Sequence, residues 1–369
     1  MKIALVSTGL GRIKRGFESF AESLFQALRH RASQIDVTLF QGGGKPGERR
    51  VVVPNLHRYG VPARWLGYDK GNLLEKRSFA LLLYPLLRIE RYNVVHYNEL
   101  VMGSALFHLR RNFGGQFKLL YCNGGPSPPM HYHRRCDFAQ VLTGPAYEEA
   151  REYGLSEKRL FLLPYGVDTQ RFSPSTRSYR STTRRELGIP ENAWVVLTSA
   201  ALNRSHKRID YLLREMAALK YAAWFVAAGQ VTDETLSLER EANCLLPGRF
   251  RFVTWPHHKM PLLYGAADIF ALASLSEGFG IVTIEAMASG LPVIIHNGPE
   301  FRWIAEESGV RCINMSERGA LTKALEEALS DGFKFEAHRD AVRRFSWETL
   351  IPNYIEMYEK MTSVQDTVC

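Results

Sequence analysis

The sequence predicts an α/β protein with two domains, each built on a mostly parallel sheet that is covered by helices. The chain has 369 residues, which is long for a single hydrophobic core. Short apolar segments with strand character alternate with amphipathic helical segments along its length. Turn-rich loops follow several of the strand candidates, as expected at the carboxyl edge of a parallel sheet.

The first domain is expected to span residues 1–172. Its strands are predicted near 2–7, 37–40, 50–53, 94–96, 118–121, 141–143 and 160–163, with helices near 16–28, 72–88 and 101–112. A strand, a glycine loop and a helix at the start are typical of nucleotide-binding domains. The G-x-G-x-x-G pattern is absent, however, so a nicotinamide site is not favoured.

The second domain is expected over residues 173–345. Strands are predicted near 194–199, 225–228, 250–254 and 291–295, and a helix near 281–288. Residues 173–186 are polar and lack a periodic apolar face, so the linker between the domains is expected there. Residues 346–369 are expected to form a separate C-terminal helix with one apolar face.

Composition limits the class of protein. Hydrophobic residues make up 46% and charged residues 23% of the chain, and no apolar run approaches the roughly 20 residues that span a bilayer. The five cysteines are scattered without CxxC spacing, which argues against structural zinc or disulfides and for a reducing compartment. The first residues have strand character and do not look like a signal peptide. We therefore expect a cytoplasmic protein, at most peripheral on the cytoplasmic face of a membrane.

The positive charge is concentrated in the first half of the chain. Residues 1–170 hold 24 Lys and Arg against 14 Asp and Glu, a net +10, whereas residues 171–369 hold 23 against 24. A basic first domain indicates an anionic partner: nucleic acid, a phosphorylated acceptor or an acidic lipid surface. Arg12, Lys14 and Arg15 follow the first strand and are expected to face this partner. The alternative is a solvated surface with surplus arginine side chains.

Residues 274–296 are the most informative stretch. Glu277 precedes a Gly-Phe-Gly turn at 278–280, and a short helix candidate then carries Glu285 on its second turn. A glycine-rich turn before a helix aims backbone N–H groups at an anion. Two carboxylates beside such an anion site suit a ligand with both phosphates and hydroxyls, such as a nucleotide-sugar. Similar strand–turn–helix segments also occur in α/β proteins without this function.

The run EGFGIVTIE from Glu277 to Glu285, with AMASGLPVI after it, resembles the E-x7-E signature of the family-4 glycosyltransferases. The segment PYGVDTQRF at 164–172 and the loop that carries Lys207 also resemble that family. The resemblance covers nearly the whole chain and is strongest in the second domain. It implies the GT-B architecture: two Rossmann-like domains that face each other across a cleft, with a C-terminal helix that crosses back to the first domain.

The resemblance also implies roles for the catalytic residues. Glu277 is expected to hold hydroxyls of the donor sugar, and Glu285 the ribose diol. Lys207 is expected to neutralise the departing diphosphate. Leu202 stands where the family usually has arginine, so Arg204 is predicted to supply the second cation.

Further contacts are expected from loops of both domains. The predicted donor-binding residues are Gly11, Gly16, Asn203, Gly229, Trp255, Pro256, Gly278, Phe279, Gly280, Ile281, Val282 and Glu285, and the acceptor-side residues are Asn123 and Gly124. Related enzymes often have a histidine at the position of Asn123. His131 and His133 follow in the same loop, but two histidines in a basic loop are more often solvated than ligands.

The implied function is transfer of a sugar from a nucleotide diphosphate donor, with a UDP-sugar favoured, to an acceptor hydroxyl with retention at the anomeric carbon. No Asp-x-Asp motif offers a magnesium clamp, so no metal or cofactor is expected. A glycan or lipid-linked acceptor in polysaccharide or glycolipid assembly fits the basic first domain. The alternatives are a nucleotide-sugar epimerase, a sugar phosphorylase or a basic nucleic-acid-binding protein. The last of these lacks a recognition-helix, zinc or RNP pattern.

Overall fold

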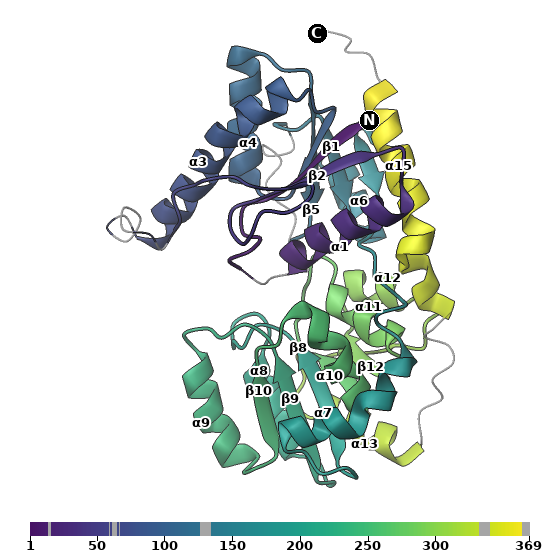
Figure 1. Cartoon of the computed structure of the whole chain (residues 1–369). Coiled ribbons are helices and arrows are strands. Elements are labelled where there is room, and N and C mark those ends of the chain that lie inside the picture. The colour runs from purple at the N-terminus through teal and green to yellow at the C-terminus, as the bar shows by residue number, and fades with distance from the viewer. Residues whose placement is uncertain are drawn as a thin grey trace. The chain divides into compact units, whose positions relative to one another are not determined.

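The contacts in the computed structural model divide the chain into two units (Figure 1). Unit 1 comprises Met1–Gly166 and the segment that starts at Trp347, and unit 2 comprises Val167–Ser346. The structure describes residues 1–13, 16–58, 60, 65, 67–125, 134–331 and 340–363. Each unit contains one parallel sheet with helices packed on it, which confirms the fold class predicted from the sequence.

Unit 1 has a seven-stranded sheet in the order β3-β2-β1-β4-β5-β6-β7, and every neighbouring pair is parallel. The strands are β1 (Lys2–Ser7), β2 (Asp36–Gln41), β3 (Arg50–Val52), β4 (Val94–Tyr97), β5 (Lys118–Asn123), β6 (Phe138–Val141) and β7 (Leu160–Leu162). The chain adds strands outward from β1 and then returns to its other side with β4. The strand order therefore reverses between β1 and β4, and such a reversal is where open parallel sheets bind ligands.

Helices cover both faces of this sheet (Figure 1). α3 (Tyr68–Ile89) and α4 (Leu100–Phe113) pack on one face, where they bury Phe79, Leu83 and Leu106 against the strands. α1 (Gly16–Arg31) and α15 (Trp347–Ser363) pack on the other face. The short helices η1 (Glu157–Arg159) and α6 (Gly144–Glu152) connect β6 to β7.

The C-terminal helix α15 is held in unit 1 by aromatic and polar contacts. Trp347 donates its indole N–H to Ser23 Oγ on α1 (2.8 Å), and Phe20 of α1 stacks near its ring. Tyr354 donates to the carbonyl of Pro164 (3.0 Å) and accepts from Gln140 Nε2 (2.9 Å). All these side chains except Ser23 are fully buried or nearly so, so the helix completes the core of unit 1.

Unit 2 has a six-stranded parallel sheet in the order β10-β9-β8-β11-β12-β13. The strands are β8 (Trp194–Ser199), β9 (Ala223–Ala228), β10 (Phe250–Val253), β11 (Ile269–Leu272), β12 (Val293–His296) and β13 (Arg311–Ile313). The helices are η2 (Pro174–Tyr179), α7 (Arg180–Leu187), α8 (Ile209–Ala217), α9 (Thr235–Leu245), η3 (His257–Lys259), α10 (Met260–Ala266), α11 (Ile281–Ala288), α12 (Pro299–Ala305), α13 (Ala320–Asp331) and η4 (Arg343–Phe345). Here the strand order reverses between β8 and β11.

The boundary between the units lies earlier than the sequence predicts. Residues 167–172 were assigned to the first domain, but they belong to unit 2. Val167 forms a parallel bridge with Ser346, and the Phe172 ring packs against Tyr264 with ring centroids 5.7 Å apart. Val167 and Phe172 are buried, so this segment is part of the core of unit 2.

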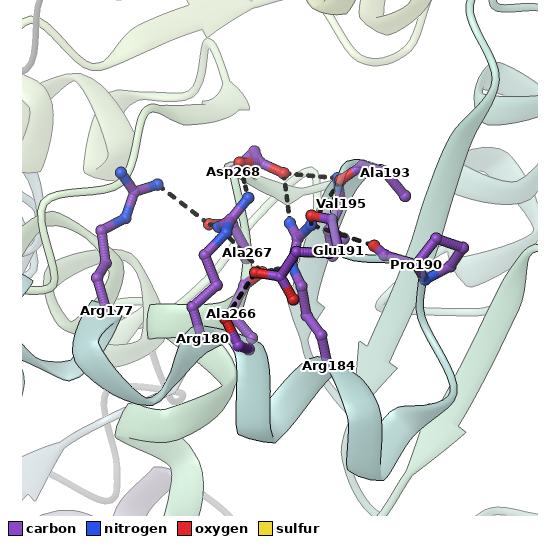
Figure 2. A network of polar contacts seen from close by, with 11 residues as sticks. Arg177, Arg180, Arg184, Pro190, Glu191, Ala193, Val195, Ala266, Ala267 and Asp268 are labelled. Atoms are coloured by element: carbon purple, nitrogen blue, oxygen red, sulfur yellow. Dashed lines mark hydrogen bonds and ion pairs between the residues drawn. The ribbon is translucent and has the colours of Figure 1, made fainter.

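The linker expected at 173–186 is wrong, because these residues form η2 and most of α7 and pack on α10. Their buried contacts are made by arginine side chains (Figure 2). Arg180 and Arg184 pair with the two oxygens of Asp268 at 2.5 and 2.8 Å, and Arg177 donates to the carbonyl of Ala267 (3.3 Å). A helix anchored in this way has no apolar stripe for sequence periodicity to detect.

Candidate functional site

The loops that follow β8 and β11 meet at the strand-order reversal of unit 2. Lys207 lies in the loop after β8, and Glu277 lies in the loop after β11. Lys207 Nζ forms an ion pair with Glu277 Oε1, and the two side chains are 19% and 12% exposed. The pair joins the two loops where parallel sheets bind ligands, and it keeps a partly buried ammonium group at the sheet edge.

The backbone around Lys207 is fixed by its own loop. Asn203 Oδ1 accepts hydrogen bonds from the amides of Lys207 (2.8 Å) and His206 (3.3 Å). Arg208 donates to the carbonyls of Met315 (2.8 Å) and Ala273 (3.3 Å). The predicted donor contact Asn203 therefore shapes the loop through its side-chain oxygen, and Arg208 anchors the loop to the rest of unit 2.

Arg204 does not join Lys207 in this structure. Its guanidinium group pairs with Glu241 on α9 and donates to Ser237 Oγ (3.4 Å), and Glu241 also pairs with Arg214. These arginines together hold the pKa of Glu241 below its usual value, although burial opposes the shift. The prediction that Arg204 supplies the second diphosphate cation therefore has no support in its geometry, because the side chain is already neutralised by a carboxylate on α9.

The Gly-Phe-Gly turn of 278–280 leads directly into α11. Gly280 caps the helix with φ +73°, a conformation that residues with a Cβ rarely adopt. The Phe279 side chain is buried against Phe345, with ring centroids 5.7 Å apart, so only the backbone of Phe279 remains to meet a ligand. Gly278, Ile281 and Val282 complete the predicted turn at the helix start.

Glu285 lies on α11, and its carboxylate is held by two side chains that the sequence did not predict for the site. Tyr264 of α10 donates to Glu285 Oε2 (2.9 Å), and His257 Nε2 lies 2.9 Å from Glu285 Oε1. Glu285 is 3% exposed. Burial raises the pKa of Tyr264 well above its ordinary value, and the Glu285 carboxylate adds to the rise, so the hydroxyl stays protonated and donates.

Arg171 sets the tautomer of His257. One guanidinium nitrogen, Nη2, lies 3.4 Å from His257 Nδ1 and also donates to the His257 carbonyl. Because a guanidinium group only donates, Nδ1 accepts and the ring proton is assigned to Nε2, from which it is donated to Glu285. A carboxylate has about four acceptor positions. Glu285 is therefore oriented by Tyr264 and His257 and still has lone pairs for hydroxyl groups of a ligand.

The orientation of Glu285 by His257 can be tested with a neighbouring histidine as control. His257→Ala is expected to weaken binding of a UDP-sugar about tenfold, or about 1.4 kcal/mol, because Glu285 loses one of its two donors. His257→Gln retains an N–H donor and should restore part of the affinity. The exposed His258, replaced by alanine, should bind as wild type does in isothermal titration calorimetry. Equal affinities for both alanine variants would contradict the role.

Gly229, Trp255 and Pro256 follow β9 and β10 at the same edge of the unit 2 sheet. A Cβ at Gly229 would lie 1.8 Å from the carbonyl oxygen of Ala200, so the close approach of these two loops requires glycine. Thr254 donates to the carbonyl of Gly229 (2.7 Å) and joins the β9 and β10 loops. The structure places these residues along the edge that also carries Lys207 and Glu277.

The predicted residues of unit 1 also lie at the carboxyl edge of their sheet or next to it. Gly11 is in the loop after β1 and packs against Gly43, and Gly16 is the first residue of α1. Asn123 ends β5, and its Oδ1 is buried without a hydrogen-bond partner in the described part of the chain. Gly124 follows it, beside the Tyr165 hydroxyl. Lys14, Arg15, His131 and His133 lie outside the described residues.

Among the described residues, His, Cys, Asp and Glu side chains do not gather in groups of three or more that could hold a metal ion. Within the same ranges, every helix is too short or too polar to cross a membrane.

Two Rossmann-like parallel-sheet units, each with a strand-order reversal, form the fold of the GT-B class. Sucrose-phosphate synthase from Thermosynechococcus elongatus has a similar structure, with a TM-score of 0.79 and 20% identity over 99% of this chain and 100% of that chain. Anabaena Alr3699/HepE in complex with UDP and glucose gives a TM-score of 0.76 and 17% identity over 97% and 99% of the two chains.

The family match is more specific. Residues 180–344, nearly all of unit 2, match the family model described as glycosyl transferases group 1. D-inositol 3-phosphate glycosyltransferase of Corynebacterium aurimucosum is 28% identical over 254 residues, which cover 63% of this chain and 60% of that protein. The enzyme of the same name from Mycobacterium bovis is 32% identical over 305 residues, 73% of this chain and 62% of that protein. The chain thus spans about three fifths of the length of these two relatives.

Proposed function

We propose that the protein is a retaining glycosyltransferase that moves a sugar from a nucleotide diphosphate donor to an acceptor hydroxyl. A UDP-sugar is the favoured donor. The observation that carries this proposal is the Lys207–Glu277 pair at the strand-order reversal of unit 2, followed by α11 with Glu285. This is the arrangement that the E-x7-E resemblance implies, and it lies in the segment that matches glycosyl transferases group 1. Anabaena Alr3699/HepE, which has a similar fold, is solved in complex with UDP and glucose and with UDP-glucose.

The chemistry needs a stabilised leaving group. The nucleoside diphosphate departs with two to three negative charges. Lys207 and the amides at the start of α11 would stabilise these charges as preorganised positive groups. Glu277 would bind hydroxyls of the donor sugar and Glu285 the ribose diol. In a front-face reaction, the C1–O bond to the diphosphate breaks as the acceptor oxygen bonds to C1 on the same face. The acceptor proton passes to the leaving phosphate oxygen.

The acceptor is proposed to be anionic, such as a phosphorylated or lipid-linked sugar in polysaccharide or glycolipid assembly. The support is the net charge of +10 over residues 1–170 and the phosphate in the names of two relatives, D-inositol 3-phosphate glycosyltransferase and mannosylfructose-phosphate synthase. The structural neighbour sucrose-phosphate synthase also has a phosphate in its name. No metal ion is assigned a role in this reaction.

A donor screen tests the proposal. Thermal shift with UDP-, GDP- and ADP-sugars should show stabilisation by one nucleotide class, with UDP expected, because a ligand that binds only the native state raises the melting temperature. Turnover should then require an acceptor. Release of free sugar without an acceptor would favour an epimerase, and a requirement for inorganic phosphate would favour a phosphorylase. No response to any nucleotide-sugar would contradict the proposal.

Glu285→Gln gives a sharper test of the ribose assignment. The variant retains the shape of the side chain and loses its charge, so hydrogen bonds worth roughly 1.5–3 kcal/mol are weakened. We expect the dissociation constant for the donor to rise by about one to two decades, measured by calorimetry with UDP. Glu300→Gln, on α12, is the matched control. Donor affinity as high as that of the wild type would show that Glu285 does not bind the ribose.

A further inference from the structure

A cluster of charged side chains lies at the carboxyl edge of unit 1, at the reversal between β1 and β4. Its members are Arg12, Arg58, Glu75, Lys76 and Glu99. Glu99 follows β4 and accepts hydrogen bonds from the amide (2.9 Å) and the hydroxyl of Thr8, which follows β1. Lys76 Nζ lies 3.9 Å from Glu99 Oε1. The cluster therefore spans the point where an open parallel sheet binds its ligand.

The cluster holds more positive than negative charge. Glu75 is fully buried and pairs with Arg58 Nε and, at 3.4 Å, with Arg12 Nη1. Arg58 is 3% exposed. Three cations thus share two carboxylates, Glu75 and Glu99. The fully buried Arg58 and Glu75 compensate each other, so the excess positive charge lies on the partly exposed Arg12 and Lys76, where it favours an additional anion.

Two hydrogen-bond donors of the cluster have no acceptor among the described residues. They are Arg58 Nη2 and Asn55 Nδ2, both buried. Arg12 Nη1 donates to Asn55 Oδ1 (2.7 Å), which fixes the orientation of the amide and leaves Nδ2 as the unpaired end. A Cβ at Gly42 would lie 2.2 Å from the carbonyl oxygen of Thr8 and 3.2 Å from Asn55 Nδ2, so glycine is required where this loop packs against Thr8 beside the donor.

Each of these two nitrogens carries two N–H bonds. Buried donors without acceptors are rare in native proteins because they are costly, and a bound water or ion can supply the acceptor where they occur. An excess positive charge beside several unpaired N–H groups matches an anion with several oxygens, above all a phosphate group. The side chains of Arg12 (28% exposed) and Lys76 (16% exposed) connect the cluster to solvent.

We propose that unit 1 binds a phosphate group of the acceptor through Arg58, Asn55 and Arg12, with Lys76 beside it. The inference rests on the proposed function, which assigns the acceptor to this unit. It adds that a phosphate group is the anion recognised on the acceptor, and it names the residues that recognise it. A soluble sugar phosphate and a lipid phosphate headgroup share this chemistry.

The experiment uses variants of the full chain that keep the buried Arg58–Glu75 pair intact. Asn55→Asp is nearly isosteric and replaces the unpaired donor by a carboxylate, which would pair with Arg12 or Arg58 and repel phosphate. Lys76→Ala removes a cation from α3, and Lys70→Ala removes an exposed lysine from the same helix as its control. Far-UV circular dichroism and the melting temperature verify that each variant folds.

Isothermal titration calorimetry with inorganic phosphate and with glucose 6-phosphate is performed at saturating UDP, which occupies the phosphate site proposed for unit 2. We expect saturable binding that Asn55→Asp weakens about ten- to a hundredfold and Lys76→Ala about tenfold. Lys70→Ala should bind as the wild type does. The same proteins are sedimented with vesicles of phosphatidylcholine with and without phosphatidic acid.

The two arms distinguish the sources of the phosphate. Saturation by glucose 6-phosphate assigns a soluble ester, whereas vesicle binding that is lost in Asn55→Asp, without binding of the soluble ester, assigns a lipid headgroup. The proposal is overturned if neither probe binds, or if Asn55→Asp binds either probe as tightly as the wild type does. UDP binding is measured separately, so failure of the donor assignment is distinguishable from failure of this phosphate site.

Discussion

Replacing Asp268 by asparagine is expected to lower the free energy of unfolding of unit 2 by about 3–5 kcal/mol, the usual cost of removing one partner from a buried ion pair. Arg184 is fully buried, and Asp268 accepts from Arg184, Arg180 and the amide of Val195 (2.9 Å). The neutral amide would leave a guanidinium group buried without its counter-charge. Urea denaturation followed by circular dichroism measures the change.

The control for this variant is Asp233→Asn, an exposed aspartate of the same unit. A surface change of this kind usually alters stability by less than about 0.5 kcal/mol. If Asp268→Asn unfolds at the same urea concentration as Asp233→Asn, the arginine network of η2 and α7 contributes no net stability. The packing of these helices on α10 would then depend on their other contacts.

The same network explains why the linker was predicted in the wrong place. Each predicted strand lies within a few residues of an observed one, because buried parallel strands are short apolar runs. The short, partly buried β13 was not predicted. α7 instead buries Arg184 and Thr183 with a single leucine. Burial lowers the pKa of Arg184, and the Asp268 carboxylate counteracts this. A polar segment is expected to be exposed, but it can be buried when its charges pair with residues that lie far away in the sequence. The sequence alone does not identify those partners.

The candidate site was likewise predicted only in part from the sequence. Lys207 and Glu277 were both assigned to the donor site from the sequence, and the structure pairs them because each follows a strand beside the reversal. The position of the Arg204 side chain could not be predicted, because its partner Glu241 lies on α9, far along the chain. The contacts of Tyr264 and His257 with Glu285 depend on how α10 and η3 pack beside α11. In the sequence, both side chains look like ordinary core or surface residues.

Lys207→Ala is expected to lower kcat by 10² to 10³, or roughly 2.7–4 kcal/mol, the usual loss when one preorganised group is removed from a transition state. Negative charge develops on the leaving diphosphate, and Lys207 is held at the sheet edge by Glu277 and by the Asn203 loop. Steady-state kinetics with the UDP-sugar identified in the donor screen would measure the effect. Lys207→Arg retains the charge but not its position, and should recover part of the rate.

The choice of control decides what this experiment can show. The neighbouring Arg208 has the same charge, but it donates to Met315 and Ala273 and lies over the Tyr211 ring at 4.4 Å, so its removal would disturb the loop itself. Lys323 of α13 is 79% exposed with a single weak pair, and Lys323→Ala should turn over as the wild type does. A rate for Lys207→Ala within a factor of three of Lys323→Ala would mean that Lys207 serves the loop structure and not the departing diphosphate.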